Sequence, residues 1–371
     1  MGLYDRELEL LKRVGRYRER RVYREGVVDL ASNDYLGLGE LPEIGERTWE
    51  RLRRFRRRGA GASLLVNGYH PAHQLLEERL CELNRIEKGV VVGSGFLGNL
   101  ALFQLLRRGD LGLVDSHYHS SGLVGAKLSQ GEIRFFPHND LEGFRRELER
   151  GRREGFRRIF TFVEGVYSMG GELVRREICE EAQREGFLVI DEAHSVGVVG
   201  ERLLGVSELY NLNRERLVKL GTLGKSLGSY GGYILGPAEV IKYLLNRARS
   251  IIYTTALSPF DTFYGLESLE YIQRNLEWLK REIDRRRRLF QTQSLIKVVE
   301  VPSIEKLLQL KQSLEKRKIV VGAIRPPTVP KPIFRIILRL PAPIPKISET
   351  LSLLTEGLSL QVPKFGSERK N

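Results

Sequence analysis

Short apolar runs alternate with segments of helical spacing from residue 89 onward. Such runs are typical of buried strands, whereas apolar residues three and four positions apart are typical of amphipathic helices. The helical patterns cover residues 97–107, 139–150 and 175–185. The expected strands are residues 89–93, 111–115, 132–136, 158–163, 187–191, 217–221 and 231–235. This alternation predicts an α/β fold with a mainly parallel seven-stranded sheet that helices cover on both faces.

The last two of these strands differ from the others, because only a short glycine-rich loop joins them. A parallel connection needs a crossover of a dozen or more residues, usually a helix. The pattern therefore predicts that the 231–235 strand runs antiparallel to the 217–221 strand.

The flanking segments predict smaller elements. Residues 5–25 have the charge pattern of an amphipathic helix. Residues 29–38 are expected to form a short strand and a turn. Helical spacing also begins at residues 69–77, where His73 is either a first-turn helix residue or a functional one. The C-terminal part predicts helix 238–250, a linker at 253–259, a long basic helix at 261–290, strands 296–301, 319–323 and 333–340, helices 304–317 and 347–358, and a loose polar tail after Pro363.

We expect an N-terminal segment (1–40), a large domain (41–258) and a small α+β domain (259–371).

Composition narrows the class of protein. With 371 residues, of which 41% are hydrophobic, the chain is long enough for one large domain and a smaller one. Its two cysteines, Cys81 and Cys179, exclude a disulfide framework, favour a reducing compartment and are best explained as small core residues. The N-terminus has no apolar signal core and no stretch is apolar enough to span a membrane, so we expect a cytoplasmic protein.

The net charge of +14 and a pI near 9.8 point to an anionic partner. Nucleic acid, a membrane, or a phosphorylated or acidic substrate carrier would each fit that charge. Most arginine clusters, such as residues 51–58 and 285–288, are explained as solvated helix faces on which acids and bases interleave. We therefore expect neither nucleic acid nor a membrane as the partner.

The strongest chemical signal is Lys225, which lies in the glycine-rich loop between the last two strands. An amine held among backbone dipoles and away from bulk water can act as a nucleophile or base. The apolar strand at 187–191 ends in Asp191, and His194 follows three residues later. The next predicted strand, 217–221, leads into the lysine loop. Carboxylate and amine are therefore predicted at the ends of separate strands of one sheet, where open α/β sheets bind ligands.

Two nucleotide-binding motifs compete for these segments. The Asp-Glu-Ala-His run and Gly224-Lys225-Ser226 resemble parts of a helicase, but a P-loop needs a glycine at the position of Lys219 and should precede the acidic strand. Residues 93–98 fit the dinucleotide fingerprint formally. A nicotinamide site would explain neither Lys225 nor Asp191, so both alternatives are weaker than a lysine-based chemistry.

Taken together, the motifs resemble those of the α-oxoamine synthases, fold-type-I pyridoxal-phosphate enzymes, over about residues 29–259 and more thinly to 339. The motifs occur in the family's order: Ser32–Leu38 (SNDYLGL), His73–Glu77 (HQLLE), Gly93–Phe96 (GSGF), His119, His138–Asp140 (HND), Glu164–Met169 (EGVYSM), Asp191–Ser195 (DEAHS), Thr222–Lys225 (TLGK), Ala248–Tyr253 (ARSIIY) and Pro327–Pro330 (PTVP). The resemblance implies pyridoxal 5'-phosphate as the cofactor and no metal site.

Site roles follow from the resemblance residue by residue. Lys225 corresponds to the Schiff-base lysine, Asp191 to the acid beside the pyridinium nitrogen, and His194 to the residue bonded to the cofactor's phenolic oxygen. His119 corresponds to the histidine stacked on the ring, with His117 as a nearby competitor.

The resemblance also implies how the cofactor's phosphate is bound. The amides of Gly95 and Phe96 open a helix and can receive the anion. Thr222 matches a phosphate-binding hydroxyl and Ser168 a hydroxyl near the ring. Thr255 would reach the phosphate of the other subunit, because these enzymes resemble obligate homodimers with shared sites.

The implied reaction joins an amino acid to an acyl thioester and releases thiol and carbon dioxide. Lys225 would act as both base and acid at the amino acid's Cα. Residues 135–140 and 252–255 most resemble the branch that condenses L-alanine with a pimeloyl thioester in biotin synthesis; branches that use glycine with acetyl or succinyl groups are alternatives. The thioester carrier could be coenzyme A or an acyl carrier protein. A homologue that binds pyridoxal phosphate or nucleic acid without catalysis is the alternative of another class.

One departure concerns the substrate carboxylate. The family has an arginine nine residues after the threonine of PTVP, where this chain has Ile337. Because strand side chains alternate, Arg335 and Arg339 are expected on the same face as Ile337. Arg335 also matches a second arginine of the family, so the resemblance makes it the preferred carboxylate ligand. Asn33 completes the expected substrate-binding residues.

Overall fold

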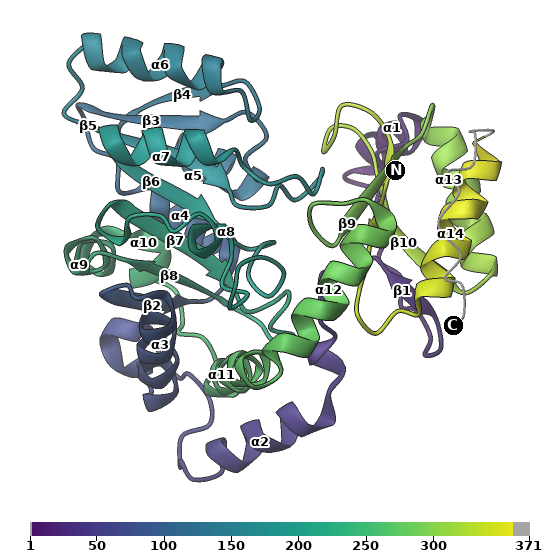
Figure 1. Cartoon of the computed structure of the whole chain (residues 1–371), viewed down its shortest axis with the longest axis horizontal. Coiled ribbons are helices and arrows are strands. Elements are labelled where there is room, and N and C mark those ends of the chain that lie inside the picture. The colour runs from purple at the N-terminus through teal and green to yellow at the C-terminus, as the bar shows by residue number, and fades with distance from the viewer. Residues whose placement is uncertain (1, 359–371) are drawn as a thin grey trace. The chain divides into compact units, whose positions relative to one another are not determined.

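The computed structural model describes residues 2–358 of the chain, so the predicted tail after Pro363 lies outside the described residues (Figure 1). Contacts divide the chain into two compact units. The larger unit holds residues 33–168 and 172–284, and the smaller unit holds residues 2–32, 169–171 and 285–358. Helix α12 (Leu276–Phe290) contributes to both. This grouping places α11 (Pro259–Arg274) in the larger unit, because it packs on α2 (Pro42–Leu52) and α3 (Pro71–Asn84).

A seven-stranded sheet forms the centre of the larger unit, in the order β2-β8-β7-β6-β5-β3-β4. The strands are β2 (Lys88–Val92), β3 (Asp110–Asp115), β4 (Glu132–Phe136), β5 (Arg158–Glu164), β6 (Phe187–Asp191), β7 (Leu217–Thr222) and β8 (Gly232–Gly236). Neighbours from β7 to β4 pair in parallel, whereas β8 is antiparallel to both β7 and β2. Each predicted strand and the predicted reversal before β8 are confirmed.

Helices cover this sheet because their apolar faces are buried against its apolar strands. They are α4 (Gly95–Phe103), α5 (Ser120–Lys127), α6 (Leu141–Arg153), α7 (Arg176–Glu185), α8 (Val206–Leu209), α9 (Ala238–Arg247) and α10 (Arg249–Ile252). Apolar residues of α4 pack with strands β2, β7 and β8 in one buried core. Ser94 begins α4 by accepting a hydrogen bond from the Leu97 amide at 3.2 Å, and Asp140 begins α6 in the same way. Both parallel and antiparallel strands are buried, as expected for a covered sheet.

The smaller unit contains a four-stranded sheet in the order β1-β10-β11-β9. Its strands are β1 (Val28–Leu30), β9 (Ile296–Glu300), β10 (Ile319–Ile324) and β11 (Ile333–Ile337), accompanied by α1 (Asp5–Arg13), α13 (Ile304–Lys316) and α14 (Ile344–Gly357). The N-terminal strand β1 pairs in parallel with β10. The predicted α+β region is therefore confirmed, with a strand from the N-terminal segment added to it.

Some predicted helices are wrong in length. The helix expected at 238–250 is two helices, α9 and α10, separated at Ala248, whose backbone is extended. The helix expected at 5–25 ends at Arg13, because Gly15 adopts a φ of +66°, which ends the helical conformation. The helix expected at 261–290 is two helices, α11 and α12, separated at Asn275. The predicted strand 333–340 is also shorter and ends at Ile337.

Candidate active site

The predicted acid, histidine and lysine converge at the carboxyl-terminal edge of the larger sheet. Asp191 is the last residue of β6 and pairs in register with Glu164, the last residue of β5. Lys225 follows β7, the other neighbour of β6, by three residues. Neighbouring parallel strands bring their carboxyl ends to one edge, so these side chains gather where open α/β sheets bind ligands.

Lys225 contacts His194 directly. The Nζ atom of Lys225 lies 2.8 Å from Nε2 of His194, and Nδ1 of the same ring lies 2.6 Å from the hydroxyl of Tyr35. Tyr35 is fully buried. If Lys225 donates a proton to Nε2, neutral His194 donates from Nδ1 to Tyr35; if the amine accepts, Tyr35 donates instead. The three groups thus form a relay that can hold a proton at either end.

The loop that carries Lys225 packs closely against the N-terminal part of the larger unit. Gly228, in the left-handed region with φ +59°, has its Cα so close to Gly39 that a Cβ would lie 2.1 Å from the Gly39 amide nitrogen. Only glycine combines this backbone angle with that approach. The loop glycine therefore places the lysine beside the SNDYLGL segment that supplies Tyr35.

Asp191 is buried and both its oxygens accept hydrogen bonds. Its Oδ1 accepts from the Ala193 amide at 2.9 Å, and its Oδ2 from the Asn99 side chain at 2.9 Å. Asn99 also donates to Ser121 at 2.9 Å, and Oγ of Ser121 lies 2.7 Å from Nδ1 of His119. A continuous network thus fixes both the acid and the predicted stacking histidine. Burial lowers the pKa of His119, although the Asp191 charge opposes that shift.

Glu164 is an unusual member of this group. Its Oε2 accepts from the Ser168 amide at 2.9 Å, whereas Oε1 is buried without a hydrogen-bond partner among the described residues. Burial, and then the charge of Asp191, raise the pKa of Glu164 to about 8. An unsatisfied buried carboxyl oxygen beside Asp191 and Lys225 indicates room for a further polar partner.

The N-terminus of α4 faces a cradle built from glycines. A Cβ at Gly232 would lie 3.0 Å from the Gly95 amide nitrogen, and one at Gly95 would lie 3.9 Å from Oγ1 of Thr222. The first amides of a helix have no intrahelical acceptor and attract anions. The Thr222 hydroxyl donates to the Gly231 carbonyl at 2.9 Å. Helix amides, a hydroxyl and bare glycine backbone thus fit a phosphate, at the same sheet edge as Asp191, His194 and His119, which the sequence predicts to contact the ring.

A second polar cluster supports the site from the end of β3. Asp115 accepts from Nδ1 of His138 at 2.9 Å, from the Asn139 amide at 2.8 Å and from the Tyr167 hydroxyl at 2.8 Å. His138 also contacts Glu172 at 2.7 Å. Burial opposes the charged form of His138, but the bonds to both carboxylates prevail and raise its pKa to about 9. His117, the predicted competitor of His119, is exposed and stacks on His138 at 3.9 Å.

The contacts of His73 decide whether it is a first-turn helix residue or a functional one. His73 lies in the first turn of α3, where Nδ1 accepts from the His70 amide at 2.9 Å, and its Nε2 lies 2.9 Å from the Leu257 carbonyl. It is fully buried, and burial lowers its pKa to about 4. These contacts explain His73 as a helix-capping residue.

The remaining predicted residues lie elsewhere. Thr255 is exposed and forms an isolated antiparallel bridge with Ser63, and Asn33 is half-buried beside Tyr35. Arg335 is buried in β11 of the smaller unit, and Arg339 is buried just beyond it, 3.1 Å from the Asp29 carboxylate. Sequence reasoning missed Asn99 and Tyr35 as members of the site, because only the tertiary fold reveals their contacts with Asp191 and His194.

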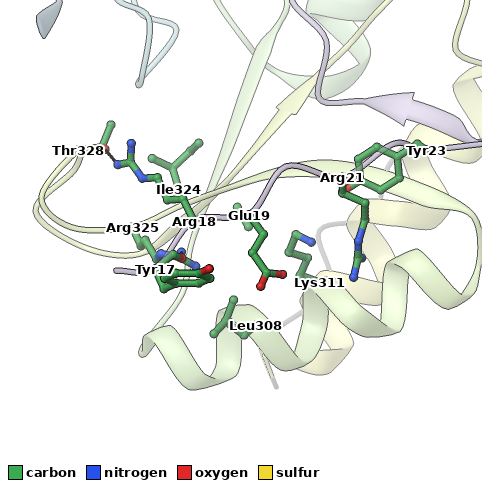
Figure 2. Close-up of a pocket in the computed structure, with 11 residues that line it drawn as sticks. Tyr17, Arg18, Glu19, Arg21, Tyr23, Leu308, Lys311, Ile324, Arg325 and Thr328 are labelled. Atoms are coloured by element: carbon green, nitrogen blue, oxygen red, sulfur yellow. Dashed lines mark hydrogen bonds between the residues drawn. The ribbon is translucent and has the colours of Figure 1, made fainter. Parts of the chain in front are cut away.

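A hollow of about 760 Å³ lies within the smaller unit and contains none of the predicted site residues (Figure 2). The N-terminal segment forms one wall with Tyr17, Arg18 and Arg21, opposite α13 and β10. Its basic groups are held by protein partners: Arg21 and Lys311 both bind Glu315, and Arg325 binds the Tyr17 carbonyl. These three side chains are therefore held in place by the protein itself.

Comparisons with known proteins agree with this geometry. The model of the family "Aminotransferase class I and II" matches residues 25–342. The chain is 38% identical over 369 residues to the 8-amino-7-oxononanoate synthase of Helicobacter pylori strain J99, which covers 97% of this chain and 98% of the relative. It is 35% identical over 332 residues to the enzyme of the same name from Alkalilimnicola ehrlichii, covering 85% and 84% of the two chains.

Solved structures share the fold. The serine palmitoyltransferase of Sphingomonas wittichii superposes with a TM-score of 0.84 at 23% identity, over 96% of this chain and 98% of that chain. The 8-amino-7-oxononanoate synthase of Francisella tularensis superposes with a TM-score of 0.74 at 23% identity, over 91% and 99%. These likenesses confirm the predicted fold type I.

Among the described residues, no helix combines the length and apolarity needed to cross a bilayer. The family match and the relatives, which share more than a third of their residues over nearly the full chain, agree with the amine, acid and phosphate cradle at the sheet edge. The chain belongs to the class I and II aminotransferase family, and it is a pyridoxal-phosphate-dependent acyltransferase similar to 8-amino-7-oxononanoate synthases.

Proposed function

We propose that the protein condenses L-alanine with a pimeloyl thioester, releasing thiol and carbon dioxide and forming the aminoketone of the biotin pathway. The observation that carries this proposal is the Lys225 amine, bound to His194 beside the buried Asp191 at the sheet edge. The relatives that span nearly the whole chain are named 8-amino-7-oxononanoate synthase, which supports this product over others.

The site residues fit pyridoxal phosphate. The amides of Gly95 and Phe96 and the hydroxyl of Thr222 would hold the phosphate, and Lys225 would hold the aldehyde carbon. Asp191 would hold the ring nitrogen in its protonated form, since a carboxylate favours a neighbouring cation. His194 and Ser168 would hold the phenolic side of the ring. The bound cofactor supplies a ring that accepts the electron pair left when a bond at Cα breaks.

Lys225 performs the proton transfers in this proposal. Its Nζ removes the proton from Cα of the amino acid and returns a proton to the same carbon after carbon dioxide has left. His194 can give a proton to Nζ or take one from it, because its other nitrogen exchanges donor and acceptor roles with Tyr35. The proton taken in the first step is thus available for the second, and the relay would hold it on Nζ or His194 in between, while the departing thiolate takes its proton from solvent.

Asp191 and His119 position the reacting group. The hydrogen bond from Asn99 and that from the Ala193 amide fix both oxygens of Asp191, so the carboxylate cannot rotate away from the ring. Ser121 fixes His119 through Nδ1, which leaves the imidazole face for stacking. Both groups would be ordered before the substrate arrives, which lowers the cost of reaching the transition state.

We propose Arg335 as the ligand of the substrate carboxylate, with Arg339 second and Asn33 as a further substrate contact. Arg339 already pairs with Asp29 at 3.1 Å, so it has a structural role of its own. Arg335→Ala should raise KM for the amino acid about 10- to 100-fold while leaving cofactor absorbance unchanged, because a charged hydrogen bond is lost. If KM moves only in Arg339→Ala, the assignment of the two arginines is reversed.

The reaction is tested by following thiol release and product mass. The purified enzyme, loaded with cofactor, is offered L-alanine with pimeloyl-coenzyme A or a pimeloyl carrier protein. Parallel reactions offer glycine with acetyl- or succinyl-coenzyme A, and serine with palmitoyl-coenzyme A. We expect the alanine and pimeloyl pair to react fastest. A faster glycine reaction would favour the runner-up, a glycine C-acetyltransferase or 5-aminolevulinate synthase, and no release with any pair would contradict the proposal.

We also propose a cytoplasmic homodimer in which Thr255 reaches the partner subunit's cofactor phosphate. Apolar side chains are exposed on both sides of the Ser63–Thr255 bridge: Leu65 is 52% exposed, Val66 78% and Tyr253 79%. An exposed apolar patch of this kind marks an interaction surface. Val66→Glu should shift the protein from dimer to monomer in sedimentation velocity. A dimer that persists in this variant would place the interface elsewhere.

A further inference from the structure

A second hollow, of about 1140 Å³, opens on the larger unit. It is lined by Arg107, Arg108, Gln130, Arg157, Arg158, Tyr243 and Arg247. These residues come from the turn before β3, the turn before β4, the start of β5 and the end of α9. Three of these segments, distant in sequence, therefore present five guanidinium groups to one concave space, and the turn before β4 adds Gln130.

The positive charge of this hollow is not balanced. The buried Asp110 carboxylate accepts from Arg157 at 3.1 Å and from Arg158 at 2.6 Å, and it also accepts from the Arg107 amide at 2.8 Å. Glu239 adds a weaker attraction on Arg158. Arg107, Arg108 and Arg247 form no ion pair within residues 2–358. Five arginines thus share two carboxylates, which favours the binding of an anion.

Tyr243 adds an independent feature. Its hydroxyl oxygen is buried and has no hydrogen-bond partner in the described part of the chain. A buried hydroxyl without a partner costs free energy, and such groups in folded proteins call for an explanation such as a ligand or water. The hydroxyl and the Gln130 amide supply neutral donors next to the guanidinium groups.

The hollow is separate from the candidate active site. Asp110 begins β3 and Arg158 begins β5, whereas Asp191 and Lys225 follow the carboxyl ends of β6 and β7. Strands rise about 3.3 Å per residue, so β5 spans roughly 20 Å between the two edges. In Figure 1 the parallel strands of this sheet, such as β3 and β4, begin on the left and run toward the right.

We propose that this hollow binds a small polyphosphate anion, with at least two linked phosphate groups. The five guanidinium groups come from three separate segments around a hollow of about 1140 Å³, so an anion with linked phosphate groups can pair with more of them at once than a single phosphate group can. The concave shape favours a compact anion over an extended nucleic acid strand or a flat membrane. Free polyphosphate and the phosphates of a nucleotide present the same chemistry, and both are included in the test.

The test is calorimetric titration of the cofactor-loaded enzyme, so that the catalytic phosphate cradle is filled. Orthophosphate, pyrophosphate, tripolyphosphate, ADP and ATP are titrated without divalent metal at low salt. We expect one site per chain that prefers tripolyphosphate or ATP to orthophosphate by at least tenfold, and whose affinity falls as salt is raised. Equal affinity for tripolyphosphate and ATP identifies free phosphates as sufficient, and tighter ATP binding identifies a nucleotide.

The double variant Arg107→Gln/Arg247→Gln should weaken tripolyphosphate binding about 10- to 100-fold, because each charge-assisted contact contributes about a factor of ten. Arg146→Gln is the matched control, since Arg146 is an exposed arginine of α6 that does not line the hollow. The proposal is overturned by absence of saturable binding, by orthophosphate binding as tightly as tripolyphosphate, by equal losses in the two variants, or by tighter binding of a single-stranded oligonucleotide. Condensation activity is not measured, so the outcome is independent of the proposed reaction.

Discussion

The two edges of the larger sheet carry different kinds of polar chemistry. At the carboxyl edge, Asp191, His194 and Glu164 are buried, and hydrogen bonds of defined geometry connect Asp191 to Asn99 and His194 to Tyr35. At the amino edge, Arg108, Arg157 and Arg247 are exposed and share one kind of charge. The first arrangement suits bond-making at one atom, whereas the second suits attraction of an anion.

The difference shows how position determines the role of a charged residue. Lys219 and Lys225 are six residues apart, but Lys219 lies within β7, fully buried, where it donates to Asn84 at 2.8 Å and to the Leu204 carbonyl. Burial lowers the pKa of Lys219 to about 8. Lys225 lies beyond the strand end, where open α/β sheets receive ligands. A lysine inside the strand stabilises packing, and a lysine past its end is available to a cofactor.

The largest expected effect is that of Lys225→Ala. Removal of the amine should lower the condensation rate by at least about 1000-fold, because base, acid and cofactor anchor are lost together. Thiol release at saturating substrate measures this rate. Arg146→Gln serves as the surface control with unchanged rate. A variant that retains a tenth of the wild-type rate would remove Lys225 from the chemistry.

A smaller effect is expected at the residue that positions Asp191. Asn99→Ala should lower the rate about 10- to 100-fold, since groups that orient catalytic residues contribute in that range. It should also shift the pH dependence of the cofactor's visible absorbance, because the carboxylate that we propose as the partner of the ring nitrogen loses a hydrogen bond. Asn99→Asp places a second negative charge beside the Asp191 carboxylate and should lower the rate further. A rate loss without any spectral change would indicate a packing defect alone.

The carboxyl edge should also control stability against pH through His138. Its folded pKa of about 9 exceeds the ordinary value of 6.5, so the stabilisation is fully present below pH 6.5 and is lost as pH rises through 9. Urea unfolding at pH 6.5 and at pH 9.5 measures the free energy of unfolding. Between these two pH values the wild type should lose roughly 2 kcal/mol more of this free energy than His138→Gln loses. His117→Gln should lose as much free energy of unfolding between the two pH values as the wild type does. Equal losses in all three proteins would contradict this role of His138.

The smallest effects compare a tyrosine from each edge. Tyr243→Phe removes a hydroxyl without a partner among the described residues, so the free energy of unfolding should stay within about 1 kcal/mol of the wild type or rise. Tyr167→Phe removes a hydroxyl that donates to Asp115 at 2.8 Å, and it should cost about 1–3 kcal/mol. Equal losses in both variants would mean that the Tyr243 hydroxyl has a partner after all.

Local sequence patterns were sufficient for much of the fold. Apolar runs predicted all seven strands of the larger sheet, and the short lysine loop predicted that β8 is antiparallel. The N-terminal helix was predicted too long, because its charge pattern continues past the residue, Gly15, whose backbone ends it. The long basic helix at 261–290 was predicted as a single helix, because no glycine or proline marks the break at Asn275.

The candidate site was predictable where residues follow strand ends. Asp191, His194 and Lys225 follow the pattern of apolar strands, and motif order identified their partners. Tyr35 lies in the SNDYLGL motif, but neither that motif nor the helix pattern around Asn99 reveals a contact with His194 or Asp191, because these contacts join segments far apart in the chain. The arginines of the second hollow are likewise distributed from 107 to 247, so only the fold brings them together.

The most direct test is to find the lysine that holds the cofactor. The protein is incubated with pyridoxal phosphate, reduced with borohydride and digested, and the modified peptide is identified by mass spectrometry. The account predicts a single modified residue, Lys225, and no modification in Lys225→Ala. Modification of Lys219 in place of Lys225, or no modification of the wild-type protein, would contradict it.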